Sequence, residues 1–282
     1  MNNQTALVSC FVRAYHSLDN NIKVYNDTLA SKILKEEEYR NISSNMEAGI
    51  NFFDENYKEG EPLKWIVNNY IGPTVLARAI FNEKHVLNDI KLGLKQYLIL
   101  GSGYDTFSYK INSKLKVFEL DKKDIIEDKI KRTKNFNNEN INYIGCDFNK
   151  NWIDELLKSN YNKHEKTFCS LLGISYYLDK FTFSNLIKTL SDNIEKGSSI
   201  LFDYPNNYDN KTEVLAKGAN EEMKSKYTYE DILKIADESN LKIYEHLDSD
   251  DINNNYFYNY NTINKIKLKA LKSVNYCLLV KY

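Results

Sequence analysis

Glycine and acidic residues stand at the ends of two apolar runs near the middle of the chain. The first run, residues 97–100, ends at Gly101 and Gly103, and the second ends with Glu119 and Asp121. Because glycine has no Cβ, a turn of this kind lets the backbone lie directly against a bound ligand. A carboxylate about twenty residues further on is placed to accept hydrogen bonds from ribose hydroxyls. The spacing therefore predicts a ligand that carries a ribose, held by Glu119 or Asp121.

The residues after the turn decide which ligand of this kind fits. A dinucleotide fingerprint has a third glycine, and here Thr106 occupies that position. Asp105 would also place a negative charge near a pyrophosphate, which opposes its binding. S-adenosylmethionine has a ribose, an adenine and a cationic amino-acid tail, so neither objection applies to it. A bare strand-to-helix turn and an NAD-dependent enzyme stay open as alternatives.

Composition and charge exclude several classes of partner. The 282 residues include 38 basic and 39 acidic side chains, a net charge of −1, which gives no reason to expect nucleic acid or an anionic membrane as partner. The cysteines and histidines are scattered without metal-ligand spacing, so we expect reduced thiols and no metal site. With no leader peptide and no apolar run of about 18 residues in view, we expect a cytoplasmic protein. The oligomeric state stays open.

Residues 1–94 read as helices without strands. Apolar residues recur at helical spacing in residues 5–17 and 27–40. Pro62 opens a helix that Gly72-Pro73 is expected to end, and a further helical pattern follows. A helical segment with no sheet of its own must pack over the rest of the chain. We therefore predict an N-terminal helical cap that acts as a lid on the ligand site.

Residues 95–282 alternate between strand and helix patterns. Such alternation predicts an α/β fold, a doubly wound, mostly parallel, seven-stranded, Rossmann-like sheet with helices on both faces. We expect a single domain over residues 1–282, with an insertion near residues 248–272 that contains a short helix at 262–271. The expected strands cover residues 97–100, 116–120, 141–144, 167–172, 199–204, 242–246 and 273–281.

A ligand on a doubly wound sheet lies across the carboxyl ends of the strands. Asp147 and Phe148 follow the third strand, where the carboxylate can accept from the adenine amino group and the ring can pack on the base. One such acid alone is more often a helix N-cap or a solvated loop carboxylate. Acids at three successive strand ends favour a binding site instead. Further residues expected at this edge are Gly173, Tyr176, Tyr177, Asp203 and Tyr204.

Six short motifs follow one another along nearly the whole chain. They are Arg13-Ala14 with Val24–Asp27 and Ala30, Ala77-Arg78, Leu100–Thr106 (LGSGYDT), Phe118–Asp121 (FELD), Gly173–Leu178 (GISYYL) and Gly197–Tyr204 (GSSILFDY). In content and in order, these motifs resemble those of the leucine carboxyl methyltransferase and polyketide O-methyltransferase family, whose members depend on S-adenosylmethionine.

The resemblance implies roles for individual residues. Arg78, and also Arg13, would pair with the methionine carboxylate of the donor, because a guanidinium binds a carboxylate through two hydrogen bonds. Asp121 would hold the ribose, and Asp147 with Phe148 would hold the adenine.

Two positions depart from the family pattern. The family carries Glu directly before the glycine that follows strand four, near the donor, whereas this chain has Leu172 before Gly173. Phe107 stands where the family often has Arg. Leu172 removes a carboxylate that would help to hold the cationic end of the donor, and Asp105 is a candidate to compensate. A donor-binding protein without turnover is therefore one alternative.

The resemblance predicts an O-methyltransferase that acts on a small molecule, with a carboxylate as the favoured acceptor. A carboxylate needs no general base, and opposite charges cancel as the methyl group moves, so a water-free pocket speeds the step. A phenol would need a base, for which Tyr176, Tyr177 and His246 are candidates. The aromatic segment 256–260 can line the acceptor pocket or simply pack. An N- or phenol-O-methyltransferase is a further alternative.

Overall fold

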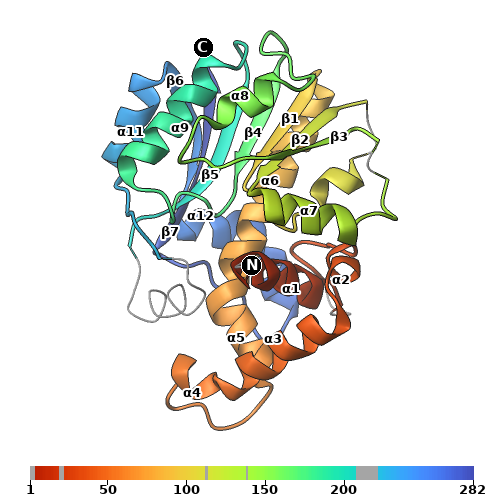
Figure 1. The fold of residues 1–282 in the computed structure, drawn as a ribbon. Coiled ribbons are helices and arrows are strands. Elements are labelled where there is room, and N and C mark those ends of the chain that lie inside the picture. The colour runs from red at the N-terminus through yellow and green to blue at the C-terminus, as the bar shows by residue number, and fades with distance from the viewer. Residues whose placement is uncertain (1–3, 19–21, 112–113, 138, 208–221) are drawn as a thin grey trace.

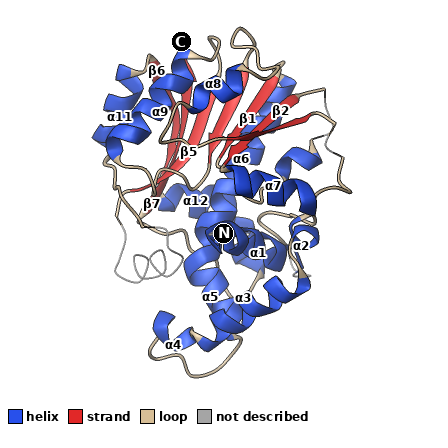
Figure 2. Cartoon of the chain, in the orientation of Figure 1, coloured by secondary structure: helices blue, strands red, loops and turns tan. Residues whose placement is uncertain are grey.

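A seven-stranded sheet forms the centre of the protein, as predicted, and helices cover both of its faces (Figures 1 and 2). The structure, a computed structural model, describes residues 4–18, 22–111, 114–137, 139–207 and 222–282. Strand β7 runs antiparallel to both of its neighbours, β5 and β6, and the other described pairs are parallel. In sheet order the strands are β3 (Ile141–Gly145), β2 (Lys116–Asp121), β1 (Gln96–Leu100), β4 (Thr167–Leu171), β5 (Ser199–Pro205), β7 (Val274–Lys281) and β6 (Leu241–Leu247).

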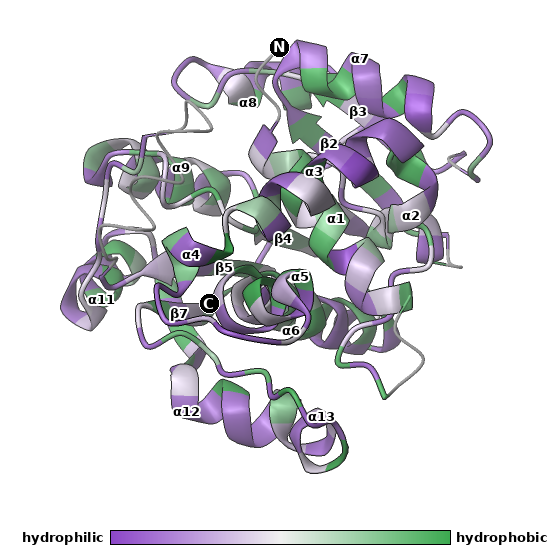
Figure 3. Cartoon of the chain, turned by 90° about the horizontal axis from the view of Figure 1, so that it is seen from below, coloured by the Kyte–Doolittle hydropathy of each residue, from purple (hydrophilic) through white to green (hydrophobic). Residues whose placement is uncertain are grey.

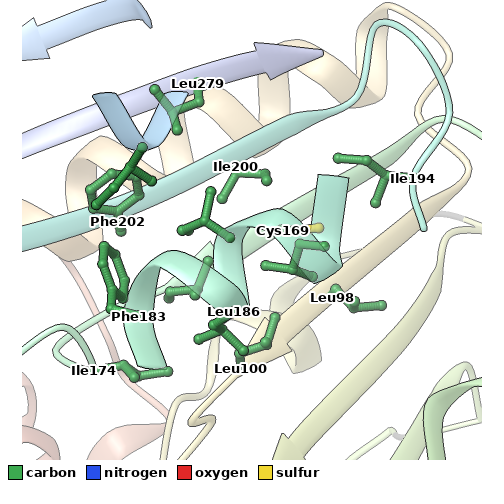
Figure 4. Packing of buried hydrophobic residues seen from close by; sticks show 14 of the residues in the cluster. Leu98, Leu100, Cys169, Ile174, Phe183, Leu186, Ile194, Ile200, Phe202 and Leu279 are labelled. Atoms are coloured by element: carbon green, nitrogen blue, oxygen red, sulfur yellow. The ribbon is translucent and has the colours of Figure 1, made fainter. Parts of the chain in front are cut away.

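Side chains of the central strand β1 alternate between two buried layers. Leu98 and Leu100 pack in one layer, where Phe183 and Leu186 from a helix lie against the sheet (Figure 4), and Tyr97 packs in the other. Burial on both faces explains why this strand is an unbroken apolar run in the sequence. The first layer is covered by α8 (Trp152–Leu157), α9 (Lys180–Asp192) and α11 (Tyr229–Glu238), and the second by α6 (Gly72–Lys91), α12 (Ser249–Ile252) and α13 (Tyr258–Ile263). Helix α7 (Lys123–Arg132) packs against β2 and β3.

The N-terminal helices form a third packed unit at one end of the sheet (Figure 1). Phe11, Ile66 and other buried side chains of these helices pack together with Tyr104, which belongs to the turn after β1. Helices such as α1 and α7 show hydrophobic and hydrophilic residues along their length in Figure 3, as expected for helices that pack on one side only. The core of the cap is therefore built directly onto the glycine turn. Its helices are α1 (Gln4–Leu18), α2 (Ala30–Ile33), α3 (Glu36–Ala48), α4 (Ile50–Phe53) and α5 (Pro62–Ile66).

Gly72 and Pro73 do not end a helix, contrary to the sequence expectation. A π-helical turn, Val67–Ile71, joins α5 to α6, and the Gly72 amide donates to the Val67 carbonyl. Proline is compatible with this position because the first residues of a helix need no amide donor. None of the described helices, α6 included, is long and apolar enough to cross a membrane.

The expected helix over residues 27–40 is also wrong, because the chain turns out of the helix in its middle. Helix α2 ends at Ile33, Leu34 is extended with ψ of 135°, and α3 starts at Glu36. Asp27 lies before α2, and its fully buried carboxylate accepts a hydrogen bond from the Ala30 amide. The apolar spacing was helical, but the polar contacts of Asp27 fix where the helix begins.

The helix of the insertion lies earlier than the sequence predicted. Asp248 caps it by accepting hydrogen bonds from the amides of Asp250 and Asp251, and the helical run continues through α12, a π-helical turn (Asn253–Phe257) and α13 to Ile263. Residues 264–271 are not helical, so the expected helix at 262–271 is wrong. The error arises because a capping acid was read as part of a polar loop.

Candidate functional site

The carboxyl ends of β1 to β4 open into one cleft, which α1 and α6 close from the other side. The cleft has a volume of about 380 Å³, within the usual range for a small-molecule site. The sequence-predicted residues that line it are Arg13, Arg78, Gly101, Gly103, Asp105, Asp121, Asp147, Phe148, Leu172, Gly173 and Tyr177. The structure thus brings together segments that lie far apart in the chain.

The glycine turn and Asp121 are bonded to each other. The Gly103 amide donates to Asp121 Oδ2 at 2.7 Å, and the Lys122 amide donates to Oδ1 at 2.7 Å. A carboxylate oxygen can accept two hydrogen bonds, so both oxygens keep capacity for ribose hydroxyls. Burial raises the pKa of Asp121 above its ordinary value, against the opposing effect of the two amides. Gly101 has φ of +64°, and a Cβ there would lie 2.7 Å from Ile174 Cδ1.

Asp147 and Phe148 form the wall beyond β3. Asp147 Oδ1 accepts from both the backbone amide and the side-chain amide of Asn149, each at 3.0 Å, and these bonds lower its pKa. The Phe148 ring meets the Trp152 ring edge to face, with centroids 5.9 Å apart. Packing on Trp152 fixes the orientation of the Phe148 ring. The ring therefore offers a flat apolar surface next to the Asp147 carboxylate, which is a hydrogen-bond acceptor.

Two guanidinium groups line the middle of the cleft, and each is held by a buried carboxylate. Arg13 Nε donates to Asp27 Oδ2 at 2.9 Å, and its Nη2 donates to the Tyr104 carbonyl at 2.7 Å. Arg78 Nη1 lies 3.5 Å from Asp203 Oδ2, and both Asp27 and Asp203 are fully buried. Held in this way, the arginines present fixed positive charge to the cleft.

Asp27 supports the site through Arg13, and the sequence alone gave it no role. Its Oδ1 accepts from Thr106 Oγ1 at 2.5 Å, so one carboxylate ties α1 to the segment after the glycine turn. Burial alone would raise the pKa of Asp27, but Arg13 and Thr106 hold it below its ordinary value. Asp27 does stand in one of the family-like motifs, which was the available signal, yet no role could be assigned without its partners.

Asp203 joins the end of β5 to the loop after β4. Its Oδ1 accepts from the Gly173 amide at 2.6 Å. Gly173 has φ of +74°, and a Cβ there would lie 2.4 Å from Arg78 Nη1. A side chain at position 173 would therefore push the Arg78 guanidinium out of place. Leu172 lines the cleft next to them and packs with apolar residues of the second layer.

Glu119 does not reach the cleft, so the ribose role considered for it does not fit the structure. The carboxylate is fully buried and lies 2.6 Å from Lys129 Nζ, and Ser108 Oγ donates to it at 2.6 Å. Burial raises its pKa, which Lys129 opposes. Of the two acids that the sequence offered, the structure places Asp121 alone beside the glycine turn.

Two of the three base candidates also lie outside the cleft. The Tyr176 hydroxyl donates to Asp203 Oδ2 at 3.0 Å, and burial raises its pKa well above the ordinary value. His246 Nε2 lies 2.7 Å from the Tyr204 hydroxyl, and burial lowers the pKa of this imidazole. Neither side chain lines the cleft, whereas Tyr177 does.

The aromatic segment 256–260 packs and does not line the cleft. Phe257 and Tyr260 are buried in the second layer, against α6. The Tyr256 hydroxyl accepts from Lys84 Nζ at 3.1 Å. The suggestion that this segment forms an acceptor pocket is therefore not supported.

The residues of the cleft fit an adenosyl ligand with an amino-acid tail. Ser102 Oγ is buried in the cleft wall and has no hydrogen-bond partner within the described residues, so a bound polar group can satisfy it. The glycine backbone and Asp121 match a ribose, and the two arginines match the carboxylate of the amino-acid tail. Across the described part of the chain, no group of three or more His, Cys, Asp or Glu residues is placed to hold a metal ion.

Comparison with known proteins places the chain in a family. The family model for leucine carboxyl methyltransferase matches residues 6–191. The chain is 37% identical over 300 residues to the "Putative S-adenosyl-L-methionine-dependent methyltransferase YktD" of Bacillus subtilis (strain 168), with 98% of this chain and 97% of that protein covered.

Two solved structures share the fold. A DUF574 family protein from Streptomyces avermitilis MA-4680 has a TM-score of 0.58 at 11% identity, covering 97% of each chain. Magnesium protoporphyrin IX methyltransferase (ChlM) from Synechocystis PCC 6803, solved with bound SAH, has a TM-score of 0.50 at 11% identity, covering 86% of this chain and 99% of that one. The family model and the relative, together with the cleft, establish the assignment: the chain belongs to the leucine carboxyl methyltransferase family and is an S-adenosylmethionine-dependent methyltransferase.

Proposed function

We propose that this enzyme methylates a carboxylate oxygen of a small molecule. The observation that carries the proposal is the position of Tyr176 and His246, which are bonded to Asp203 and Tyr204 and lie outside the cleft. A neutral phenol or a protonated amine must lose a proton to react, and these two side chains cannot take it from a molecule in the cleft. Tyr177 does line the cleft, but a neutral tyrosine hydroxyl is a proton donor and a poor base. A carboxylate is already ionised at neutral pH and needs no such base.

When bound, S-adenosylmethionine supplies a methyl group on a positively charged sulfur. The protein's contribution is to hold the acceptor oxygen in line and to keep water out. Leu172, Ile99 and Val75 supply apolar wall to the cleft, which favours a reaction in which opposite charges cancel. Lys224 also lines the cleft, and its positive charge would attract an anionic acceptor. The donor-binding residues expected from the sequence, without Glu119, are part of this proposal.

The chemical stability of the product tests the proposal. Wild-type enzyme is incubated with S-adenosylmethionine labelled in the methyl group and a protein-free extract of small metabolites, and the products are then treated with mild base. A methyl ester releases volatile labelled methanol under these conditions, whereas an N-methyl or aryl methyl ether group does not. We expect most of the transferred label to become volatile; base-stable label would favour the N- or phenol-O-methyltransferase alternative.

The pH dependence of the rate provides a second prediction. Carboxylic acids have pKa values of about 4, so a carboxylate acceptor is fully ionised throughout the range from about pH 6 to 9. At saturating donor, kcat/KM for the acceptor should change less than about threefold over that range. A phenol with a pKa of about 10 would instead give a rate that rises about tenfold per pH unit. Such a rise in the initial rates would contradict carboxylate methylation.

A further inference from the structure

Besides Ser102 Oγ, a second buried polar atom in the cleft wall has no hydrogen-bond partner among the described residues. Asn82 is 2% exposed, and its Oδ1 accepts no hydrogen bond within the part of the chain that the structure describes. Leaving a buried acceptor unpaired is costly, since its hydrogen bond to water is lost on folding. Asn82 lines the cleft, so a bound molecule can supply the missing donor.

The other end of the Asn82 amide is fixed to the sheet. Its Nδ2 donates to the Tyr97 hydroxyl at 2.8 Å, and this hydroxyl lies 3.0 Å from Ser170 Oγ. The chain of contacts joins α6 to β1 and β4 and lies in the second buried layer. Because Nδ2 is used in this way, Oδ1 is the amide atom that remains for a ligand.

The neighbours of Asn82 identify the kind of donor that belongs there. Arg78 and Asn82 are four residues apart on α6, so they lie one above the other on the same side of that helix. Arg78 lines the cleft and is the residue predicted to pair with the methionine carboxylate of the donor molecule. In an amino acid the ammonium and the carboxylate are attached to the same carbon, so groups that bind the two must be neighbours.

Asp105 adds negative charge to the same region. It lines the cleft, and its Oδ1 accepts from the Phe107 amide at 2.6 Å, which fixes the side chain. Asn82 and Asp105 line the same cleft, so the negative charge of Asp105 would favour a cation bound between their oxygens.

We propose that Asn82 Oδ1 and Asp105 form the subsite for the ammonium group of S-adenosylmethionine in this chain. Asn82 accepts one N–H directly, and Asp105 supplies the opposite charge. This subsite concerns the methyl donor, so it holds whichever atom accepts the methyl group.

The test is a calorimetric titration with three ligands that differ only in the tail. They are S-adenosylhomocysteine, its deaminated analogue in which hydrogen replaces the amino group, and 5′-methylthioadenosine, which lacks the amino-acid part. Asn82→Leu should weaken S-adenosylhomocysteine about 10- to 100-fold, as expected for loss of a charge-assisted hydrogen bond, and should leave the other two within about threefold. Asp105→Asn should show the same selectivity.

Asn82→Asp is the matched control, because a carboxylate can accept both from the ammonium and from the Tyr97 hydroxyl. This variant should bind S-adenosylhomocysteine with an affinity close to that of wild type, and more tightly than Asn82→Leu binds the same ligand. Retained binding of 5′-methylthioadenosine shows that each variant is folded. Equal weakening of S-adenosylhomocysteine and its deaminated analogue would overturn the proposal, as would unchanged binding of S-adenosylhomocysteine to Asn82→Leu.

Discussion

Asp121→Ala should reduce the affinity for S-adenosylhomocysteine about 100- to 10,000-fold. In the proposed site this variant removes two charge-assisted hydrogen bonds to ribose hydroxyls, each worth about 1.5–3 kcal/mol, and each 1.4 kcal/mol is a factor of ten. It also releases the Gly103 amide, which donates to this carboxylate at 2.7 Å, so the glycine turn loses its support. Isothermal titration calorimetry of wild type and variant measures the change directly.

Two further variants separate a local effect from general damage. Asp121→Asn keeps the size and one acceptor oxygen, so it should fall between wild type and Asp121→Ala. Glu127→Ala changes an exposed acid on α7 and should bind as wild type does. Near-normal affinity in Asp121→Ala would mean that the ribose lies elsewhere and that the site has been misplaced.

Asp27→Ala should lower the free energy of unfolding by about 3–5 kcal/mol. The carboxylate is fully buried, and the ion pair with Arg13 Nε is 2.9 Å long, so the variant leaves a buried guanidinium without its counter-charge. Donor binding should fall as well, because Arg13 then loses the contact that holds it against the cleft. Urea denaturation gives the stability, and Glu37→Ala on the exposed side of α3 is the control.

The pH dependence of this stability difference follows from the pKa of Asp27. Arg13 and Thr106 hold that pKa below its ordinary value of 3.8. A lowered folded-state pKa means that the stabilisation is fully present above the unfolded-state pKa and is lost as the pH falls through the folded-state pKa. The difference between wild type and Asp27→Ala should therefore be constant from about pH 5 to 8 and shrink below about pH 4. A difference that shrank at neutral pH would contradict a charged Asp27.

Local patterns in the sequence predicted the sheet because each strand is specified by its own residues. The unbroken apolar run of β1 and the glycines after it need no distant partner to be recognised. The failures concern residues whose role depends on distant contacts. Glu119 and Asp121 are two residues apart and chemically alike, and the contacts with Lys129 from α7 and with Ser108 hold the Glu119 carboxylate away from the cleft. Nothing local in the sequence marks Lys129 as its partner.

The candidate site shows the same division. Residues of the glycine turn and of the strand ends could be predicted to meet, because the carboxyl ends of parallel strands share an edge. Asp27 could not be given a role, because it acts through Arg13 and Thr106. Thr106 lies 79 residues away from Asp27 in the chain. Asn82 gave no signal at all, because an unpaired oxygen can be recognised only once all of its neighbours are known.

Titration of the wild-type protein with S-adenosylhomocysteine tests most directly whether this cleft is the donor site. We expect one binding site per chain and, at a ligand concentration of about 100 times Kd, a stabilisation of about 2.7 kcal/mol, seen as a Tm about 5 °C higher. NAD should produce neither heat nor a shift. Absence of heat and of any Tm change with S-adenosylhomocysteine would contradict the assignment of the cleft, whatever the fold.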